Sequence, residues 1–457
     1  MSATEFLNPT DPASGEALAP VPVTTPDQLA QAVAAARAAA RAWGETPFEE
    51  RAERLRGFAR ALTGEAAEAL ARQAMQEMGK PIREARGEVR GVGSRLESLI
   101  KAAREACAAE SGVESGIKVE VHWRPLGVVA VIGPWNYPVA TPNNLVVSAL
   151  LTGNTAVFKP SEFTPHTGGL YAKLLAEHLP AGVVGLVQGT GAVGAGLVAG
   201  DVDMIAFTGS IATGQAIMRT AAQSMKRLVL ELGGKDPMIV LPGADLEAAA
   251  RHAAIEATRN TGQVCVAVER VIVHRDIAEA FARRVAEVVR GLRVGDPRDE
   301  ATDLGPMANA RQREQVLAQL AAAKAAGAEF LVEGEARGPG FYLTPSVVVG
   351  VAPTMDLARH ETFGPVVAIQ VAGDAEEAVA RANDTVYGLG ASVWGPEGPE
   401  LDAIAGRIQA GMVGINRGLS TAAGAPWVGW KMSGFGYTRS AAGMRQFLAP
   451  QSRARKA

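Results

Sequence analysis

The chain contains 457 residues, with 45 Lys and Arg against 48 Asp and Glu, so its formal net charge is −3. A chain of this length is expected to form two or three domains, each with its own hydrophobic core. The nearly neutral charge argues against nucleic acid as a partner, because proteins that neutralise phosphates are usually strongly basic. Cys107 and Cys265 are the only cysteines, which excludes a disulfide framework and favours a reducing compartment.

The sequence carries no recognisable targeting, membrane or metal signal. The N-terminus has neither a basic start nor an apolar stretch, and the apolar runs fall short of the roughly 18 residues that span a bilayer. The six histidines show no His-Glu-x-x-His motif, and there is no Cys-x-x-Cys pair. We therefore expect a cytoplasmic protein with no membrane partner and no metal site.

Residues 27–110 are rich in Ala, Arg, Glu and Leu at helical spacing, which predicts consecutive amphipathic helices. From residue 127 onward, short β-branched runs alternate with helical patterns, as in a parallel sheet covered on both faces. The predicted strands are 128–132, 155–158, 183–187, 204–207 and 228–230. In such a sheet, ligands bind at the carboxyl ends of the strands.

A second α/β series follows the Gly/Pro-rich break at residues 233–237. Its predicted strands are 238–241, 268–273, 347–351 and 366–371, and its predicted helices lie near 276–292, 309–327 and 374–383. The alternation predicts an α/β fold with two α/β domains and mostly parallel sheets.

Two strand ends in the first series carry candidate nucleotide-binding residues. Lys159, Ser161 and Glu162 follow the strand 155–158, and a cation beside a carboxylate could hold a ribose, although a surface ion pair would have the same residues. Gly209 and Ser210 end the strand 204–207 and start a helix, which suits a pyrophosphate or simply a helix cap.

A glycine-rich loop at residues 189–194, Gly-Thr-Gly-Ala-Val-Gly, matches the dinucleotide-binding fingerprint. The acidic residue that usually follows about 20 residues later to bind a ribose is missing. A tight turn that lets helix and strand pack closely explains the loop equally well.

Cys265 lies in a Gly-containing turn, residues 260–265, between a predicted helix and a strand. A free cysteine is most often a buried small hydrophobic residue, and Cys107 within an Ala-rich helix fits that description. Two further strand-end loops carry Glu231 and Asn136, so a thiol, a base and an amide donor could converge.

Seven motifs, in colinear order over nearly the whole chain, resemble those of the aldehyde dehydrogenase superfamily. They are Pro134-Trp135-Asn136-Tyr137-Pro138, Lys159-Pro160-Ser161-Glu162, Phe207-Thr208-Gly209-Ser210, Glu231-Leu232-Gly233-Gly234-Lys235, Gly262-Gln263-Val264-Cys265, Glu361-Thr362-Phe363-Gly364-Pro365 and Lys431-Met432-Ser433-Gly434. The resemblance implies a homodimer or homotetramer that oxidises a small-molecule aldehyde with NAD, with NADP as the alternative cofactor.

The resemblance also implies roles for the catalytic residues. Cys265 would attack the aldehyde to form a thiohemiacetal and then a thioester, which water activated by Glu231 would hydrolyse. Asn136 and the backbone N–H of Cys265 would hold the oxyanion. The implied cofactor residues are Pro134, Trp135, Lys159, Ser161, Glu162, Gly209, Ser210, Leu232, Glu361 and Phe363.

By the same resemblance, residues 1–115 and 125–236 form a Rossmann-like cofactor domain and 237–425 a catalytic domain that carries Cys265. Residues 116–124 and 440–457 would form a small oligomerisation element. The family tends to close with a strand that joins a neighbouring subunit, whereas 447–450 is expected to form only a short strand, because Pro450 cannot donate to a ladder. The basic tail, 452–457, is expected to be solvated.

Two sequences depart from the family pattern near the expected substrate entrance and subunit contacts. Residues 426–429 read Pro-Trp-Val-Gly where the family usually shows Pro-Phe-Gly-Gly, and 436–438 read Gly-Tyr-Thr where it shows Gly-Arg-Glu.

Three alternative functions remain open. An acylating enzyme would pass the thioester to coenzyme A, although Glu231 favours water. A cysteine hydrolase would need a histidine beside Cys265, and the nearest in sequence are His252 and His274. A non-catalytic binding protein would be expected to have lost part of the set Asn136, Glu231 and Cys265.

Overall fold

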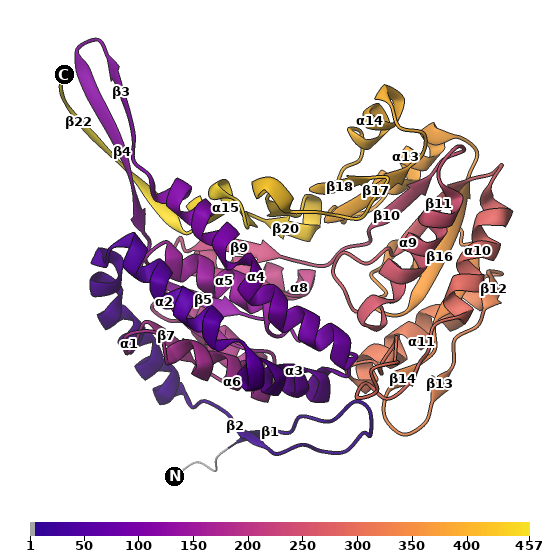
Figure 1. The fold of residues 1–457 in the computed structure, drawn as a ribbon, viewed down its shortest axis with the longest axis horizontal. Helices are drawn as coiled ribbons and strands as arrows, with labels where there is room; N and C mark the ends of the chain where they lie inside the picture. Colours follow the sequence, from indigo (N-terminus) through magenta and orange to yellow (C-terminus); the bar gives the residue numbers. More distant parts are fainter. Residues whose placement is uncertain (1–4) are drawn as a thin grey trace.

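The structure, a computed structural model, describes residues 5–457 and consists of two α/β domains and a projecting three-stranded sheet (Figure 1). The predicted α/β class with mostly parallel sheets is confirmed. Within the described residues, no helix combines the length and the apolar character needed to cross a membrane.

The first sheet has six strands in the order β20-β9-β8-β5-β6-β7. They are β5 (Val128–Ile132), β6 (Thr155–Lys159), β7 (Val184–Leu186), β8 (Met204–Thr208) and β9 (Arg227–Glu231), all parallel, and β20 (Gly434–Phe435), antiparallel to β9. The connecting helices are α5 (Ala140–Leu151), α6 (Pro165–Ala176), α7 (Gly191–Ala199) and α8 (Ile211–Ala222). The chain builds outward on one side of β5 and then returns to its other side, which creates a topological switch point where ligands bind.

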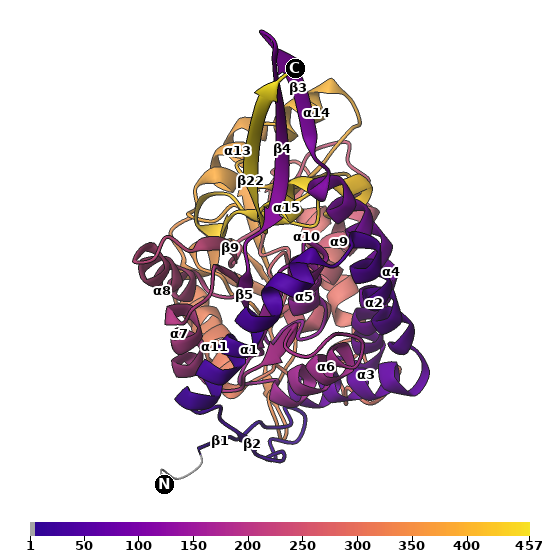
Figure 2. The same cartoon turned by 90° about the vertical axis from the view of Figure 1, so that its left-hand side faces the viewer.

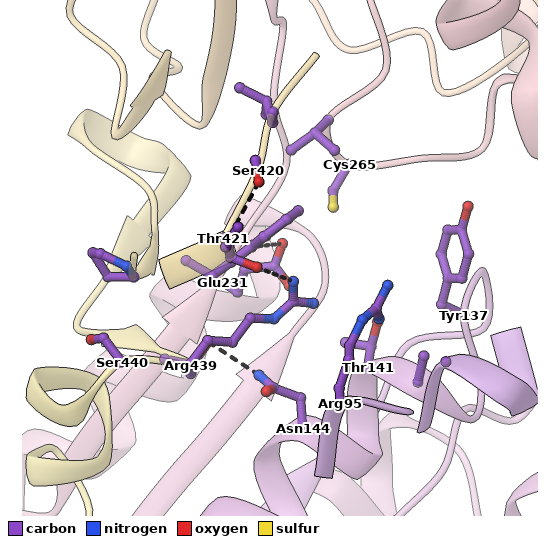
Figure 3. Close-up of a pocket in the computed structure, with 18 of the residues that line it drawn as sticks. Arg95, Tyr137, Thr141, Asn144, Glu231, Cys265, Ser420, Thr421, Arg439 and Ser440 are labelled. Carbon is purple, nitrogen blue, oxygen red and sulfur yellow. Dashed lines mark hydrogen bonds between the residues drawn. The ribbon is translucent and has the colours of Figure 1, made fainter. Parts of the chain in front are cut away.

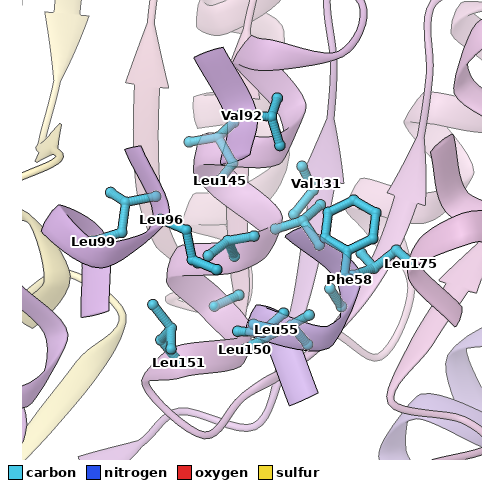
Figure 4. Close-up of a cluster of buried hydrophobic side chains, with 14 of the residues drawn as sticks. Leu55, Phe58, Val92, Leu96, Leu99, Val131, Leu145, Leu150, Leu151 and Leu175 are labelled. Atoms are coloured by element: carbon cyan, nitrogen blue, oxygen red, sulfur yellow. The ribbon is translucent and has the colours of Figure 1, made fainter. Parts of the chain in front are cut away.

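Four N-terminal helices pack around this sheet and its connecting helices, and the Ala-rich pattern predicts the helices themselves. They are α1 (Pro26–Glu45), α2 (Phe48–Ala61), α3 (Gly64–Met78) and α4 (Ile82–Cys107). A capping box between Thr25 and Gln28 begins α1, with Pro26 at its first position. Figure 4 shows the resulting core, in which apolar residues of α2, α4, α5 and α6 pack around β5.

The second sheet has the order β12-β15-β16-β11-β10-β17-β18 and is parallel except for β12. Its strands are β10 (Pro237–Val240), β11 (Arg270–His274), β12 (Glu329–Val332), β15 (Ser346–Val349), β16 (Val366–Ala372), β17 (Gly390–Trp394) and β18 (Met412–Ile415). Its helices are α9 (Leu246–Thr258), α10 (Ala278–Arg290), α11 (Ala310–Ala325), α12 (Asp356–Arg359), α13 (Ala375–Asn383) and α14 (Pro399–Ala405). The predicted helices and strands of this series agree with these bounds to within a few residues.

Several short elements complete the chain. They are β1 (Phe6–Leu7), β2 (Val21–Pro22), η1 (Arg259–Gly262), β13 (Ala336–Arg337), β14 (Tyr342–Leu343), η2 (Ala422–Gly424), β19 (Trp427–Val428), η3 (Lys431–Ser433), β21 (Tyr437–Thr438) and α15 (Ala441–Arg445).

The expectation that residues 447–450 form only a short strand was wrong, although the basic tail 452–457 is exposed as expected. Strand β22 (Leu448–Lys456) pairs antiparallel with β4 (Ile117–Pro125) along nine residues, and β3 (Glu110–Glu114) lies on the other side of β4. Pro450 is tolerated because β22 is the edge of this sheet, where a missing N–H costs little. Figure 2 shows the three strands extending beyond both domains. The use of this element in oligomerisation stays a prediction.

A buried ion pair lies where the chain crosses from β9 to β10. Lys235 Nζ donates to Glu269 Oε2 at 2.7 Å and to Thr362 Oγ1 at 2.9 Å. Glu269 also accepts the backbone N–H groups of Thr362 and Phe363. Both charged side chains are buried, and burial lowers the pKa of Lys235. This fully hydrogen-bonded pair therefore joins the crossing to the loop 361–365.

We expect Glu269→Gln to lower the free energy of unfolding by about 3–5 kcal/mol, because Lys235 would keep a buried charge without a counter-charge. Urea unfolding and the thermal midpoint measure the loss. The matched control is Glu287→Gln, which breaks an exposed ion pair with Arg284 and should cost less than about 1 kcal/mol. Equal midpoints for the two variants would contradict this account of the junction.

Candidate active site

A cavity of about 1200 Å³ lies between the two domains, and Cys265 and Glu231 both line it (Figure 3). Glu231 is the last residue of β9, and Cys265 follows the short helix η1. The predicted convergence of thiol and carboxylate is therefore present, although the two residues belong to different segments of the fold.

The loop before Cys265 has an unusual backbone. Asn260, Thr261 and Gly262 have φ angles of 52°, 55° and 72°, a left-handed run that is costly for the first two residues. The buried Asn260 amide donates to the carbonyls of Asn136 and Gln263, which stabilises this conformation. A Cβ at Gly262 would lie 2.1 Å from the carbonyl oxygen of Gly364, so the close approach requires glycine.

Asn136 lies against this loop and is buried. Its side-chain Nδ2 donates to the backbone carbonyl of Gln263 at 3.0 Å, two residues before Cys265. An amide NH₂ group carries two hydrogens, so one donor remains for another acceptor. The strand-end loop after β5 thus brings Asn136 next to the Cys265 loop.

Glu231 is held by a residue from the C-terminal part of the chain. The indole N–H of Trp427 donates to Glu231 Oε1 at 3.0 Å, and the guanidinium carbon of Arg439 lies 4.4 Å from the centre of the Trp427 ring. Trp427 belongs to β19, which pairs with β21. The departure from the family pattern at residues 426–429 therefore lies in direct contact with the candidate base.

The acidic surroundings control the charge of the thiol. Burial raises the pKa of Cys265 well above its ordinary value, and the nearby carboxyl groups of Glu231, Asp236 and Glu361 add to that rise. Burial, together with the charge of Glu269, also raises the pKa of Glu361 to about 8. The thiol in the free protein is therefore protonated at neutral pH and needs a proton acceptor to react.

The predicted ribose residues lie together at the end of β6. Lys159 Nζ is 3.6 Å from Glu162 Oε2 and donates to the carbonyl of Pro160 at 3.0 Å. Burial lowers the pKa of Lys159. Ser161 accepts the N–H of Phe163, and a Cβ at Gly194 would lie 3.5 Å from Cδ of Lys159. The glycine-rich loop thus borders this site and packs closely, as its turn interpretation predicts.

The start of α8 forms the neighbouring corner. Ser210 caps the helix by accepting the N–H of Thr213 at 3.3 Å, and a Cβ at Gly209 would lie 2.4 Å from the ring of Phe207. Leu232 packs against Gly214 of the same helix, where an added Cβ would lie 2.7 Å away. The N-terminus of this twelve-residue helix has N–H groups without partners inside the helix, which suits the binding of an anion.

The loops carrying Trp135 and Glu361 meet across the two domains. Trp135, which follows Pro134, packs edge-to-face against Phe363 with ring centres 5.4 Å apart. Glu361 Oε1 accepts the N–H of Gly234 at 2.9 Å. Together, these groups fit a dinucleotide. They are a cation beside a carboxylate, a helix N-terminus, an aromatic pair and a buried glutamate.

The sequence did not predict several basic residues that line the cavity. Arg95 on α4, Arg259 and Arg439 line the same cavity, and Arg259 donates to the hydroxyl of Tyr137 at 3.0 Å. The local sequence does not distinguish an arginine that lines a cavity from one that faces solvent. Within residues 5–457 there is no cluster of three or more His, Cys, Asp or Glu that could hold a metal ion.

A family model described as the aldehyde dehydrogenase family matches residues 1–452. The chain is 36% identical over 445 residues to a succinate semialdehyde dehydrogenase from Escherichia coli, named for NAD(P)+, covering 97% of this chain and 96% of that protein. The crystal structure of lactaldehyde dehydrogenase from Escherichia coli has a TM-score of 0.96 at 32% identity, covering 100% of this chain and 97% of the other. An indole-3-acetaldehyde dehydrogenase in complex with NAD+ has a TM-score of 0.95 at 35% identity, covering 99% and 94%.

These similarities confirm the predicted enzyme class, aldehyde oxidation with NAD(P). They do not test the roles of single residues, which stay predictions. Because the family model and these relatives span nearly the full chain, this protein belongs to the aldehyde dehydrogenase family.

Proposed function

We propose that this protein is a hydrolytic aldehyde dehydrogenase in which Cys265 is the nucleophile and Glu231 the general base. The observation that carries the proposal is that Cys265 and Glu231, from distant segments, line one cavity, while Asn136 donates to the Gln263 carbonyl beside Cys265. A thiol, a carboxylate and an amide donor at one site are the groups that thioester chemistry requires.

In the first step, Cys265 Sγ bonds to the aldehyde carbon, and the thiol proton leaves for an acceptor. Cys265 reacts as the thiolate after its proton passes to solvent, which leaves the Glu231 carboxylate free to act as the base of the second step. The carbonyl oxygen becomes an oxyanion that accepts from the free hydrogen of Asn136 Nδ2 and from the backbone N–H of Cys265.

The expected dinucleotide, when bound, supplies the acceptor for the hydride that converts the thiohemiacetal into a thioester. Lys159, Ser161 and Glu162 would hold its adenosine ribose, and Gly209 with Ser210 its pyrophosphate. Glu361 would hold the second ribose, with Phe363 against the nicotinamide side. Pro134, Trp135 and Leu232 would complete the walls of this site.

In the second step, Glu231 takes a proton from water, and the resulting hydroxide attacks the thioester carbon. The carbon–sulfur bond breaks, which releases a carboxylic acid and restores Cys265. The hydrogen bond from Trp427 orients the Glu231 carboxylate within the cavity. Glu231 therefore favours water over coenzyme A as the acceptor.

We also propose that the protein works in the cytoplasm as a homodimer or homotetramer. The projecting sheet supports the assembly, because β3 and β22 are its two edge strands, and every residue of β3 and residues 450–456 of β22 are exposed. An open strand edge of this kind can pair with a second chain. The presence of two free cysteines and no disulfide agrees with a reducing compartment.

The proposal is tested with a panel of aldehydes that includes succinate semialdehyde, lactaldehyde and indole-3-acetaldehyde, each with NAD and with NADP. We expect reduced cofactor, followed by absorbance, with at least one pair. Cys265→Ala should abolish the signal because no nucleophile remains, whereas Cys107→Ala should retain it. The proposal fails if no aldehyde is oxidised with either cofactor.

Replacing Glu231 by Gln should separate the two chemical steps. Glutamine keeps the acceptor for Trp427 but cannot take a proton from water, so steady-state turnover should fall roughly 10²- to 10⁴-fold. Rapid mixing should still show a first-turnover burst of reduced cofactor. Unchanged steady-state turnover would mean that another group activates the water.

Glu162 should favour NAD, because its carboxylate can accept from ribose hydroxyls but repels a 2′-phosphate. We expect Glu162→Gln to raise the NADP to NAD ratio of kcat/KM by roughly 2- to 5-fold, since the side chain is partly exposed and the repulsion is screened. The exposed Glu177→Gln is the control. A wild-type preference for NADP, or a constant ratio, would remove Glu162 and Lys159 from the ribose site.

A further inference from the structure

Four basic side chains line the cavity that contains Cys265: Arg95, Lys101, Arg259 and Arg439. Arg259 already has a counter-charge, because it forms an ion pair with Glu256 at 2.8 Å. Neither Arg95 nor Arg439 forms an ion pair with any carboxylate in the described part of the chain, residues 5–457. The cavity therefore holds two arginines that no carboxylate of the described chain contacts directly.

Arg439 is held in the cavity wall by its own surroundings. Its guanidinium lies over the Trp427 ring, and its one side-chain hydrogen bond is a long contact of 3.4 Å to Thr421 Oγ1. The preceding residue, Thr438, is buried and accepts from Asn144 of α5 at 3.1 Å. Arg439 has a φ of 69°, a conformation that non-glycine residues rarely adopt outside functional sites or tight turns.

Arg95 reaches the same space from α4, on a different wall. Figure 3 shows Arg95 and Arg439 directed toward the open space into which the Cys265 thiol also points. Burial, and next the positive charge of Arg95, lower the pKa of Arg439. The Glu231 carboxylate offsets only part of this effect. Two like charges that face one cavity with no carboxylate in contact repel each other, and an anion between them would relieve that repulsion.

We propose that Arg439 and Arg95 bind a carboxylate at the far end of the substrate, so that the preferred aldehyde is a semialdehyde of a dicarboxylic acid. This proposal rests on Cys265 being the nucleophile at the other end of the substrate. A guanidinium group donates two parallel hydrogen bonds to a carboxylate, which gives both affinity and orientation. The hydroxyl groups of Ser420, Thr421 and Ser440 line the same wall and add further donors.

The first test compares kcat/KM for succinate semialdehyde with that for butanal, which has the same chain length without the carboxylate. We expect the wild type to prefer succinate semialdehyde. Arg439→Gln and Arg95→Gln should each lower this ratio about 10- to 100-fold, chiefly through a higher KM for the charged substrate. The control is Arg90→Gln on the same helix, an exposed position outside the cavity lining, which should leave the ratio unchanged.

The second test measures binding without turnover. Succinate should raise the thermal midpoint of the wild-type protein in a saturable manner, and butyramide should not. The Arg95→Gln, Arg439→Gln double variant should lose the succinate effect. If no aldehyde is oxidised at all, the proposed function fails, yet the succinate shift still decides whether the two arginines bind a carboxylate.

Four results would overturn the proposal. The wild type could show no preference for the carboxylated aldehyde, or the double variant could keep both the preference and the succinate shift. A stronger preference for glyceraldehyde 3-phosphate would assign the arginines to a phosphate instead. If only Arg259→Gln loses the preference, and Arg95→Gln and Arg439→Gln keep it, the carboxylate binds Arg259.

Discussion

The buried ion pair between Lys235 and Glu269 is the interaction on which the arrangement of the site depends. It lies at the crossing from the first sheet to the second, and Glu269 also binds the backbone of Thr362 and Phe363. One carboxylate thereby connects the segment after Glu231 with the loop that carries Glu361. Both charges are buried, so separating them would leave each charge unpaired in a poorly solvating environment. The pair therefore holds the domain crossing and the loop 361–365 together beside the cavity.

The loop before Cys265 shows how a strained backbone is retained. Thr261 is β-branched and left-handed, a combination that a free loop would avoid. Buried hydrogen bonds from Asn260, and from Thr261 Oγ1 to the carbonyl of Gly305, offset the cost. The thiol is thus positioned by hydrogen bonds of residues several positions before it in the chain.

The C-terminal segment supplies Trp427 and Arg439 to the lining of the cavity. Trp427 contacts both Glu231 and Arg439, so one aromatic ring links the candidate base to the basic wall of the cavity. A phenylalanine at this position would preserve the ring but would have no N–H to donate. The same segment leads into β22, whose long pairing with β4 ties the C-terminus to the first domain.

The sequence by itself determined the α/β class, the two βαβ series and the motif residues, because strand and helix periodicity and short motifs are local properties. Asn136, Glu231 and Cys265 were found this way, and the structure brings them to one region. Only the tertiary structure decided the contact of Trp427 with Glu231, the shared cavity of Arg95 and Arg439, and the length of β22. These features join residues hundreds of positions apart, and a surface arginine or a proline-containing tail has the same local pattern whether or not a partner packs against it.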